Sequence, residues 1–233
     1  MSDTPPQIDP VRPDLIVLDV NETLSDLAPL GAVFAQVGLD ENDVAAWFAD
    51  VLGDGFALTV LGDNPSFAEV AAAGLRVRLA AAGSPDPAAG ARQVLESFTH
   101  LEPHADVVPG LRAIAAAGCR IVTLSNASAD VARTLLAGTG ADDVVEAYLD
   151  VAGAAWKPDP RAYGHALSAT GVAPGRAMLV AAHPWDLEGA RRAGLRTAWI
   201  NRVGGEYPAY FDRADLEAPS FVDLAAAFGA PRR

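Results

Sequence analysis

Residues 15 to 26 read Leu-Ile-Val-Leu-Asp-Val-Asn-Glu-Thr-Leu-Ser-Asp, and this stretch decides the fold. The apolar run Leu15–Leu18 is typical of a fully buried strand in a parallel sheet. Ligands of open α/β sheets bind beyond the carboxyl ends of such strands, where Asp19 would lie. The hydroxyl of Thr23 can hydrogen-bond back to this loop. These residues alone predict either a site around Asp19 or a strand followed by a simple Asx turn.

An alternation of apolar runs and helical patterns after residue 108 predicts a doubly wound parallel sheet, the Rossmann-like α/β fold. Strands are expected at 120–124, 148–151, 177–180 and 197–200, with a last short strand at 221–222. Helices are expected at 109–117, 129–137, 160–170, 186–193 and 223–228.

The stretch between Leu27 and Pro103 lacks strand patterns of the parallel type and is helical instead. Ser66 and Glu69 have the spacing of a capping box. Helices are expected at 32–37, 41–52, 66–82 and 88–98, broken by the glycines at 38, 53, 55 and 62. We therefore expect a mobile N-terminal lead at 1–13, an α/β core domain at 14–27 plus 104–233, and an inserted helical cap domain at 28–103.

Composition narrows the classes of partner. The chain has 233 residues, of which 51% are hydrophobic, and a net charge of -13, which argues against nucleic acid or an anionic membrane as partner. We see no signal peptide and no apolar stretch of membrane-spanning length. A single cysteine, Cys119, fits a reducing compartment, so we expect a cytoplasmic protein. Whether it forms a homodimer stays open.

Lysine occurs once in this sequence. Sixteen of the 17 basic residues are arginine, and the exception, Lys157, directly precedes Pro158. An ammonium differs from a guanidinium in shape and hydration, so this choice indicates a functional position. The alternative is a surface lysine that occurs here by chance.

Polar residues follow three further predicted strands. Ser125 and Asn126 follow 120–124, and their hydroxyl and amide can bind a carboxylate or phosphate oxygen. Lys157 follows 148–151, with Tyr163 one turn into the next helix. Asp186 follows 177–180. The simpler interpretations are helix N-caps, a surface lysine and a carboxylate stabilised by a helix N-terminus.

In this order, the four patterns resemble the motifs of the haloacid dehalogenase superfamily, and they are most similar to the type II L-2-haloacid dehalogenases. The resemblance covers residues 14–27 and about 104–225. It implies that Asp19 is a nucleophile that forms an ester with the substrate, with Lys157, Asp186, Thr23 and His183 as further catalytic residues. It also implies that the substrate, a small organic anion, contacts Val20, Asn21, Ser125, Asn126, Trp47, Phe48, Tyr163 and Trp185.

Departures from the phosphatase pattern help to assign the reaction. Superfamily phosphatases have a second aspartate where this chain has Asn21, and acidic magnesium ligands in the fourth motif, where it has Ala181, Ala182 and His183. Because Mg²⁺ prefers carboxylate-supported oxygen sites, we expect no metal or other cofactor. The predicted function is hydrolytic dehalogenation of small 2-haloalkanoic acids. The alternatives are a magnesium-dependent phosphatase, or a catalytically weak protein that binds small acids.

The chain also departs from typical dehalogenases. They have tyrosine at the position of Asn21, serine and asparagine at 181 and 183, and a cap arginine that receives the halide. No lysine or arginine occurs between Asp14 and Leu75. His183 is expected to orient the hydrolytic water or to hydrogen-bond Asp19 or the substrate, the alternative being a structural loop histidine. Candidates for the halide site are Asn21, His183, Arg76, Arg78, or the cap aromatics Trp47, Phe48, Phe56 and Phe67.

Overall fold

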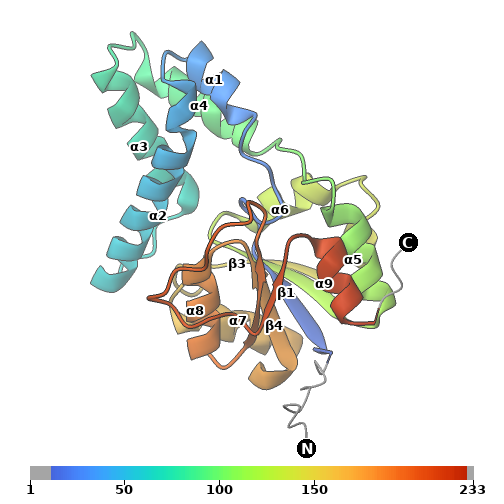
Figure 1. Cartoon of the computed structure of the whole chain (residues 1–233). Helices are drawn as coiled ribbons and strands as arrows, with labels where there is room; N and C mark the ends of the chain where they lie inside the picture. The colour runs from blue at the N-terminus through green and yellow to red at the C-terminus, as the bar shows by residue number, and fades with distance from the viewer. Residues whose placement is uncertain (1–11, 230–233) are drawn as a thin grey trace, which may run out of the picture.

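The computed structural model describes residues 12–229, which form an α/β core and a helical cap above it (Figure 1). The core contains a parallel sheet of six strands in the order β3-β2-β1-β4-β5-β6. The strands are β1 (Leu15–Leu18), β2 (Arg120–Ser125), β3 (Ala147–Asp150), β4 (Ala177–Ala181), β5 (Arg196–Ile200) and β6 (Leu216–Ala218). The expected doubly wound sheet is confirmed. The mobile lead predicted at 1–13 lies almost entirely outside the described residues.

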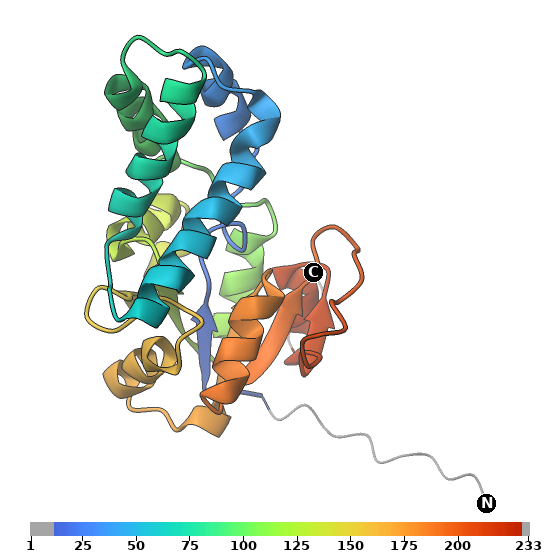
Figure 2. The same cartoon turned by 90° about the vertical axis from the view of Figure 1, so that its left-hand side faces the viewer.

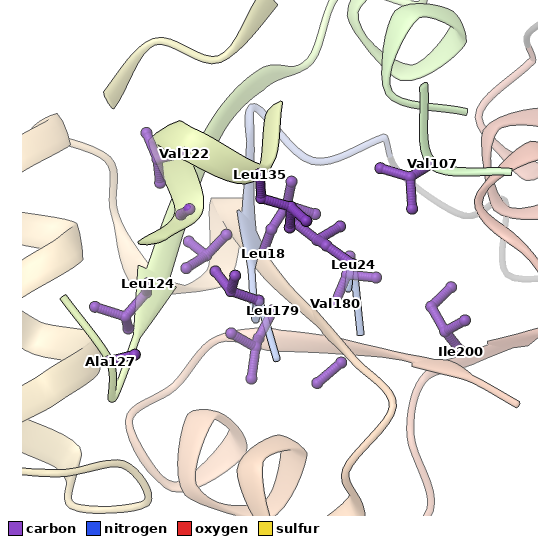
Figure 3. Packing of buried hydrophobic residues seen from close by; sticks show 14 of the residues in the cluster. Leu18, Leu24, Val107, Val122, Leu124, Ala127, Leu135, Leu179, Val180 and Ile200 are labelled. Carbon is purple, nitrogen blue, oxygen red and sulfur yellow. The ribbon is translucent and has the colours of Figure 1, made fainter. Parts of the chain in front are cut away.

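Strand β1 occupies the centre of the sheet. All four of its residues are apolar and fully buried, as a strand covered on both faces requires. Figure 3 shows Leu18 surrounded by core side chains from β2 and β4, among them Leu124 and Leu179. β1 pairs with β2 on one side and β4 on the other, so the strand order reverses at β1. This switch point is where α/β sheets of this kind bind ligands.

Helices cover both faces of the sheet. Helices α5 (Val107–Ala116) and α9 (Phe221–Ala227) pack on each other on one side, and α7 (Pro160–Thr170) and α8 (Pro184–Arg192) pack on each other on the other (Figure 1). Helix α6 (Ala129–Leu136) packs on β2 and β3. The contact between α7 and α8 depends on Gly189, because a Cβ there would lie 2.5 Å from the hydroxyl oxygen of Tyr163.

The strand predicted at 221–222 is wrong. Phe221 and Val222 begin α9 instead, because the Ser220 side chain accepts a hydrogen bond from the Asp223 amide and caps the helix. The last strand is β6, which is only three residues long and ends at Ala218, three positions before Phe221. Two of its three residues are not fully buried, so it lacks the apolar run by which strands are recognised in a sequence.

Helices α1 (Leu30–Gln36), α2 (Val44–Leu61), α3 (Phe67–Ala81) and α4 (Pro87–Phe98) form the cap. A 3₁₀ turn at Glu41–Asp43 precedes α2. Figure 2 shows α2 and α3 side by side, standing above the carboxyl ends of the strands. The predicted capping box is present, since Ser66 and Glu69 exchange side-chain and backbone hydrogen bonds. The cap is thus inserted between β1 and β2, as the sequence indicates.

The sequence predicts that the helix breaks at Gly53 and Gly55. In the structure, helix α2 continues through both glycines to Leu61. The reason is a tertiary contact. Gly55 lies against the ring of Trp156 in the core, and a Cβ at this position would come within 2.2 Å of that ring. The glycine serves a close approach between cap and core rather than a turn.

The expectation that no apolar stretch reaches membrane-spanning length is also wrong. Among the described residues, Glu41–Leu61 is long and apolar enough by length and composition alone. About a third of this stretch is buried inside the molecule, including Trp47, Phe48 and Val51. In the structure, therefore, part of its apolar character is used for packing within the cap and onto the core.

Candidate active site

The four sequence motifs meet at the carboxyl edge of the sheet. Asp19 directly follows β1 and Asn126 directly follows β2. Lys157 lies in the loop between β3 and α7, and Asp186 lies in the first turn of α8, just after β4. Parallel strands end at one edge, so residues that are 138 positions apart in the sequence come into hydrogen-bond contact.

Lys157 lies between two carboxylates. Its Nζ atom donates to Asp19 Oδ1 at 2.7 Å and to Asp186 Oδ2 at 2.8 Å. The three side chains are 1%, 7% and 0% exposed, in the order Lys157, Asp19 and Asp186. A buried lysine requires such partners, because an unpaired charge in the interior is strongly disfavoured. The lone lysine of the sequence is therefore a buried residue and not a surface one.

Other side chains fix this ion pair. The Tyr163 hydroxyl donates to Asp186 Oδ1 at 2.5 Å and also lies 3.0 Å from the Asp186 carbonyl oxygen. The Asn126 side chain accepts from the Lys157 backbone amide at 2.8 Å and donates to the Lys157 carbonyl at 3.3 Å. Both carboxylate oxygens of Asp186 are thus occupied, and the loop that carries Lys157 is held on β2.

The ionisation states of Asp19, Lys157 and Asp186 depend on one another. Burial works to raise the pKa of Asp19, but the Lys157 charge and the hydrogen bond from His183 outweigh it and hold that pKa well below its usual range. Burial works to lower the pKa of Lys157, and the charges of Asp186 and Asp19 raise it instead. Burial raises the pKa of Asp186. Asp19 is therefore ionised at neutral pH, as a nucleophile must be.

The other oxygen of Asp19 has different partners. Thr23 Oγ1 donates to Asp19 Oδ2 at 2.6 Å and accepts from the backbone amide of Ala182 at 2.9 Å. His183 Nδ1 lies 3.1 Å from the same Oδ2, and His183 Nε2 lies 2.8 Å from Glu22 Oε2. The imidazole therefore bridges two carboxylates, which places His183 in the site and not in a structural loop role.

The His183–Glu22 pair is charged and partly accessible. Burial works to lower the pKa of His183, but the hydrogen bonds and charges of Asp19 and Glu22 raise it to about 10. The side chains of His183 and Glu22 are 16% and 38% exposed. Glu22 adopts a left-handed backbone conformation with φ of 60°, which is uncommon for a residue other than glycine. This conformation belongs to the loop that positions the Glu22 carboxylate against His183.

Aromatic side chains cover the His183 ring. His183 stacks on Trp185 with ring centroids 5.3 Å apart, and Phe48 from α2 lies 6.5 Å away. Phe56 packs on Trp185 at 4.9 Å. Trp47, in contrast, is fully buried in the cap core, where it contacts Phe34, Phe48 and Phe98. Of the two cap residues predicted to contact the substrate, Phe48 lies next to His183 and Trp47 is buried within the cap.

Core and cap are joined directly beside the site. Trp156, the residue before Lys157, donates from its indole nitrogen to the carbonyl of Pro65 at 2.8 Å and stacks on Phe67. Asn64 donates to the carbonyl oxygens of Val151 and Ala152 at 3.2 and 3.3 Å. Arg78, a sequence candidate for the halide site, instead forms ion pairs with Asp43 and Asp50 within the cap.

The residues predicted to bind the substrate are only partly free to do so. Ser125 Oγ accepts from the Ala127 amide at 3.0 Å, which leaves its hydroxyl hydrogen to donate. Asn126 uses one amide hydrogen on Lys157 and retains the other. Asn21 is 6% exposed, and its Oδ1 has no partner among the described residues. Val20 is fully buried. Tyr163 contacts Asp186 from the core.

A cavity of roughly 620 Å³ lies between core and cap on the His183 side of Asp19. Of the predicted site residues, only His183 lines it, together with Glu22, Val44, Trp199 and Arg202. Asp19 itself is 5% exposed and lies behind His183. The cavity therefore reaches His183 and Glu22 but not Asp19.

Sequence reasoning missed two residues of this site, Glu22 and Arg202. Arg202, just after β5, donates twice to the carbonyl of Thr23, at 3.2 and 2.6 Å, and once to Asp106 at 2.8 Å. It fixes the loop that carries Asp19 and Thr23. A charged residue between Asp19 and Thr23 was a visible signal for Glu22, whereas Arg202 is one of 16 arginines and had no distinguishing pattern.

The donor set does not resemble a metal centre. Within residues 12–229, no group of three or more His, Cys, Asp or Glu side chains is arranged to hold a metal ion. The two carboxylates that a metal would bridge, Asp19 and Asp186, both bind the Lys157 ammonium. A cation in that space would have to displace a buried positive charge.

Comparison with known proteins agrees with the fold and identifies the family. The haloacid dehalogenase-like hydrolase family matches residues 13–194, and the chain belongs to this family. It is 31% identical to haloacetate dehalogenase H-2 of Moraxella sp. (strain B) over 130 residues, 55% of this chain and 58% of that protein. It is 26% identical to (S)-2-haloacid dehalogenase H-109 of Pseudomonas putida over 195 residues, 82% and 87% of the two chains.

A solved structure shares the whole architecture. L-2-haloacid dehalogenase from Xanthobacter autotrophicus superposes with a TM-score of 0.80 and 23% sequence identity, covering 91% of this chain and 97% of that one. At this identity the likeness concerns the fold, including the cap inserted after the first strand. The family predicted from the sequence motifs is thereby confirmed.

Proposed function

We propose that this protein hydrolyses the carbon–halogen bond of small 2-haloalkanoic acids through an ester of Asp19. The observation that carries the proposal is the buried Lys157 ammonium, which binds both Asp19 and Asp186 and keeps Asp19 ionised at the switch point of the sheet. The relatives named above, two of which are called haloacetate and (S)-2-haloacid dehalogenases, support the same substrate class.

In the first step an Asp19 oxygen attacks the carbon that bears the halogen, and the halide leaves with the bonding electrons. Thr23 and Lys157 hold the carboxylate in place from its two sides. The remaining donor hydrogens of Ser125 and Asn126 would bind the substrate carboxylate. Arg78 pairs with Asp43 and Asp50 within the cap, so the positive edges of Phe48 and Trp185 are our candidates to meet the halide.

In the second step water attacks the ester carbonyl carbon of Asp19 and releases a hydroxy acid. The sequence suggests Asp186 as the group that positions or deprotonates this water. The Asp186 side chain is 0% exposed and both of its carboxylate oxygens accept hydrogen bonds, so we propose that Asp186 holds Lys157 in position. Removal of the halide and hydrolysis of the ester then need no metal or other cofactor.

The phosphatase alternative has less support, since the ammonium of Lys157 occupies the space between the two carboxylates. A protein that only binds small acids would retain the buried ion pair but show no turnover. The donor hydrogens that Ser125 and Asn126 retain fit a small anionic substrate. A cytoplasmic location and a homodimer stay predictions.

Halide release from chloro-, bromo- and fluoroacetate and from 2-halopropionates, followed by ion chromatography, tests the reaction class. Release by the wild type and none by Asp19→Asn is expected. Absence of halide release from every acid in this screen, together with thermal stabilisation by the same acids, would favour the binding protein.

A single turnover in oxygen-18 water with enzyme in excess tests the ester. The hydroxyl oxygen of the product then comes from Asp19, so the product stays largely unlabelled and the label appears in the peptide that contains Asp19. A labelled hydroxyl after one turnover means direct attack by water, and Asp19 would then be a general base.

A further inference from the structure

We propose that His183, oriented by Glu22, is the general base that hydrolyses the Asp19 ester, and that the pair passes the released proton to the solvent of the adjoining cavity. This inference rests on the proposed function, since it assumes that the ester forms. It concerns Glu22, which no motif of the sequence singled out, and it gives His183 a specific role.

Geometry is the first support. His183 Nδ1 lies 3.1 Å from Asp19 Oδ2, so the imidazole stands beside the carboxylate that becomes the ester. A base for this step must lie within hydrogen-bond reach of a water molecule next to that carbonyl carbon. Asp186 lies behind Lys157 and is fully enclosed, whereas His183 lines the cavity.

The second support is the orientation of the ring. Glu22 Oε2 lies 2.8 Å from His183 Nε2, and Trp185 stacks on the ring with centroids 5.3 Å apart. A carboxylate on one ring nitrogen leaves the other nitrogen directed at the reacting group and stabilises the imidazolium, as in the Ser-His-Asp triad. This placement requires a left-handed φ at Glu22, which is energetically unfavourable for a residue other than glycine.

Access to solvent is the third support. Glu22 and His183 both line the roughly 620 Å³ cavity, while Asp19 does not. A proton can therefore move from His183 to cavity water without crossing the buried Lys157 group. The ionisable groups that face His183 directly are Asp19 and Glu22, and the others that line the cavity are Asp26, Glu41, His104 and Arg202.

The order of proton transfers follows from charge. In the resting enzyme two carboxylates keep His183 protonated. When the Asp19–carbon bond forms and the carbon–halogen bond breaks, Asp19 loses its charge, so His183 Nδ1 releases its proton to cavity water while Nε2 keeps its hydrogen on Glu22. The neutral imidazole can now accept a proton from the hydrolytic water.

The second half-reaction restores the starting state. As His183 takes one proton from water, the hydroxide adds to the carbonyl carbon of Asp19. The carbonyl carbon–ester oxygen bond then breaks, and the alkoxide takes the proton of the added hydroxyl. Asp19 returns as a carboxylate, His183 returns as an imidazolium, and the sum is haloacid plus water giving hydroxy acid, halide and one proton.

The test separates the two half-reactions. Rapid-quench experiments with enzyme in excess would follow halide and hydroxy acid separately, using the haloacid with the highest wild-type rate in the screen. His183→Asn keeps a donor near Asp19 but cannot accept a proton. His165→Asn, on the exposed face of α7, is the matched control.

For His183→Asn we expect a full burst of halide and at least about 100-fold slower release of hydroxy acid, as loss of a general base implies. The ester should accumulate and be visible as an added mass on the Asp19 peptide. His165→Asn should behave like the wild type. Wild-type rates of ester hydrolysis in His183→Asn would overturn the inference, as would equal loss of both half-reactions.

Glu22→Gln gives an independent readout. Hydrolysis of the ester in the wild type should become faster as the pH rises and His183 loses its proton. Removing the Glu22 charge should move the midpoint of this profile to lower pH, and an unmoved profile contradicts a role for Glu22. If the wild type itself releases no halide, the proposed function fails first, and this outcome is distinct from a failure of the base assignment.

Discussion

The two oxygens of Asp19 face surroundings of opposite character. Oδ1 binds Lys157, which Asp186 and Tyr163 hold in turn, and all three side chains are almost fully buried. Oδ2 binds Thr23 and His183, and His183 leads to a partly exposed Glu22 at the cavity. One side is thus enclosed, and the other leads through His183 and Glu22 to the cavity.

This difference separates two tasks that a covalent mechanism imposes on a single carboxylate. Nucleophilic attack needs a fixed charge in a fixed position, which buried and fully paired neighbours supply. Hydrolysis of the ester needs a group that exchanges protons with solvent, which buried and fully paired neighbours cannot do. The buried side suits the first task, and the accessible side suits the second.

The largest effect should come from Asp19→Asn, which removes the group common to both sides. We expect a loss of turnover of about 10⁴-fold or more, because an amide is not a competent nucleophile. Steady-state halide release measures the loss, and circular dichroism checks that the fold is retained. Substantial activity in this variant would remove Asp19 from its assigned role.

Lys157→Arg should have the next largest effect, because it alters only the buried side. A guanidinium is planar and larger than an ammonium, and it cannot bind Asp19 and Asp186 at the positions that Nζ occupies. We expect halide release to fall about 100-fold or more, since the charge that supports Asp19 is displaced.

Arg161→Lys is the matched control for this substitution. Arg161 lies four residues away, is 64% exposed and pairs with Asp159 at the surface, so its exchange should leave the rate unchanged. If Lys157→Arg were as active as Arg161→Lys, the buried ion pair would have no part in catalysis.

How much of this site could be predicted depends on the kind of residue. Asp19, Lys157 and Asp186 each follow a strand that an apolar run reveals, and their meeting follows from the parallel sheet. Lys157 also stood out by being the only lysine. Residues of this kind are readable from a sequence, because local pattern and global topology give the same answer.

The roles of residues that depend on tertiary contacts could not be predicted from the sequence in this way. Gly55 looks like a helix breaker, but it makes room for Trp156 inside a continuous helix. Trp47 has the composition of a lid residue, but packing within the cap buries it. Glu22 gains its importance only from His183, which is 161 positions away. In each case the partner lies far along the chain.

A smaller effect is expected on the free energy of unfolding, and it tests the His183–Glu22 side of Asp19. The pKa of His183 is about 10 in the folded protein against 6.5 for an ordinary histidine. A raised pKa stabilises the fold fully below the unfolded value, and this contribution is lost as the pH rises through the folded value. The free energy of unfolding of the wild type, relative to His183→Asn, should therefore decrease between pH 6.5 and 10.

Urea unfolding of both proteins at several pH values measures this difference. Because Lys157 and Tyr163 are present in both, their own titration largely cancels in the comparison. A difference that stays constant from pH 6.5 to 10 would mean that His183 is not held as an imidazolium, and the accessible side would lose its assigned charge.

The smallest expected effect is that of a chelator, which asks whether the buried side is complete without a metal. Phosphatase chemistry would need Mg²⁺ near Asp19 and Asp186, but Lys157 already donates to both carboxylates at 2.7 and 2.8 Å. Asn21 supplies an amide where a carboxylate ligand would be needed, and Mg²⁺ depends on carboxylate support.

Halide release after dialysis against EDTA should therefore stay within about twofold of its starting rate, as expected when no site of suitable ligands exists. Added magnesium should not increase it, and phosphate release from an aryl phosphate should stay at background with or without the metal. Loss of halide release in EDTA that magnesium restores would show that a cation shares the space of the Lys157 ammonium, and the division between a closed and an open side of Asp19 would then have to be redrawn.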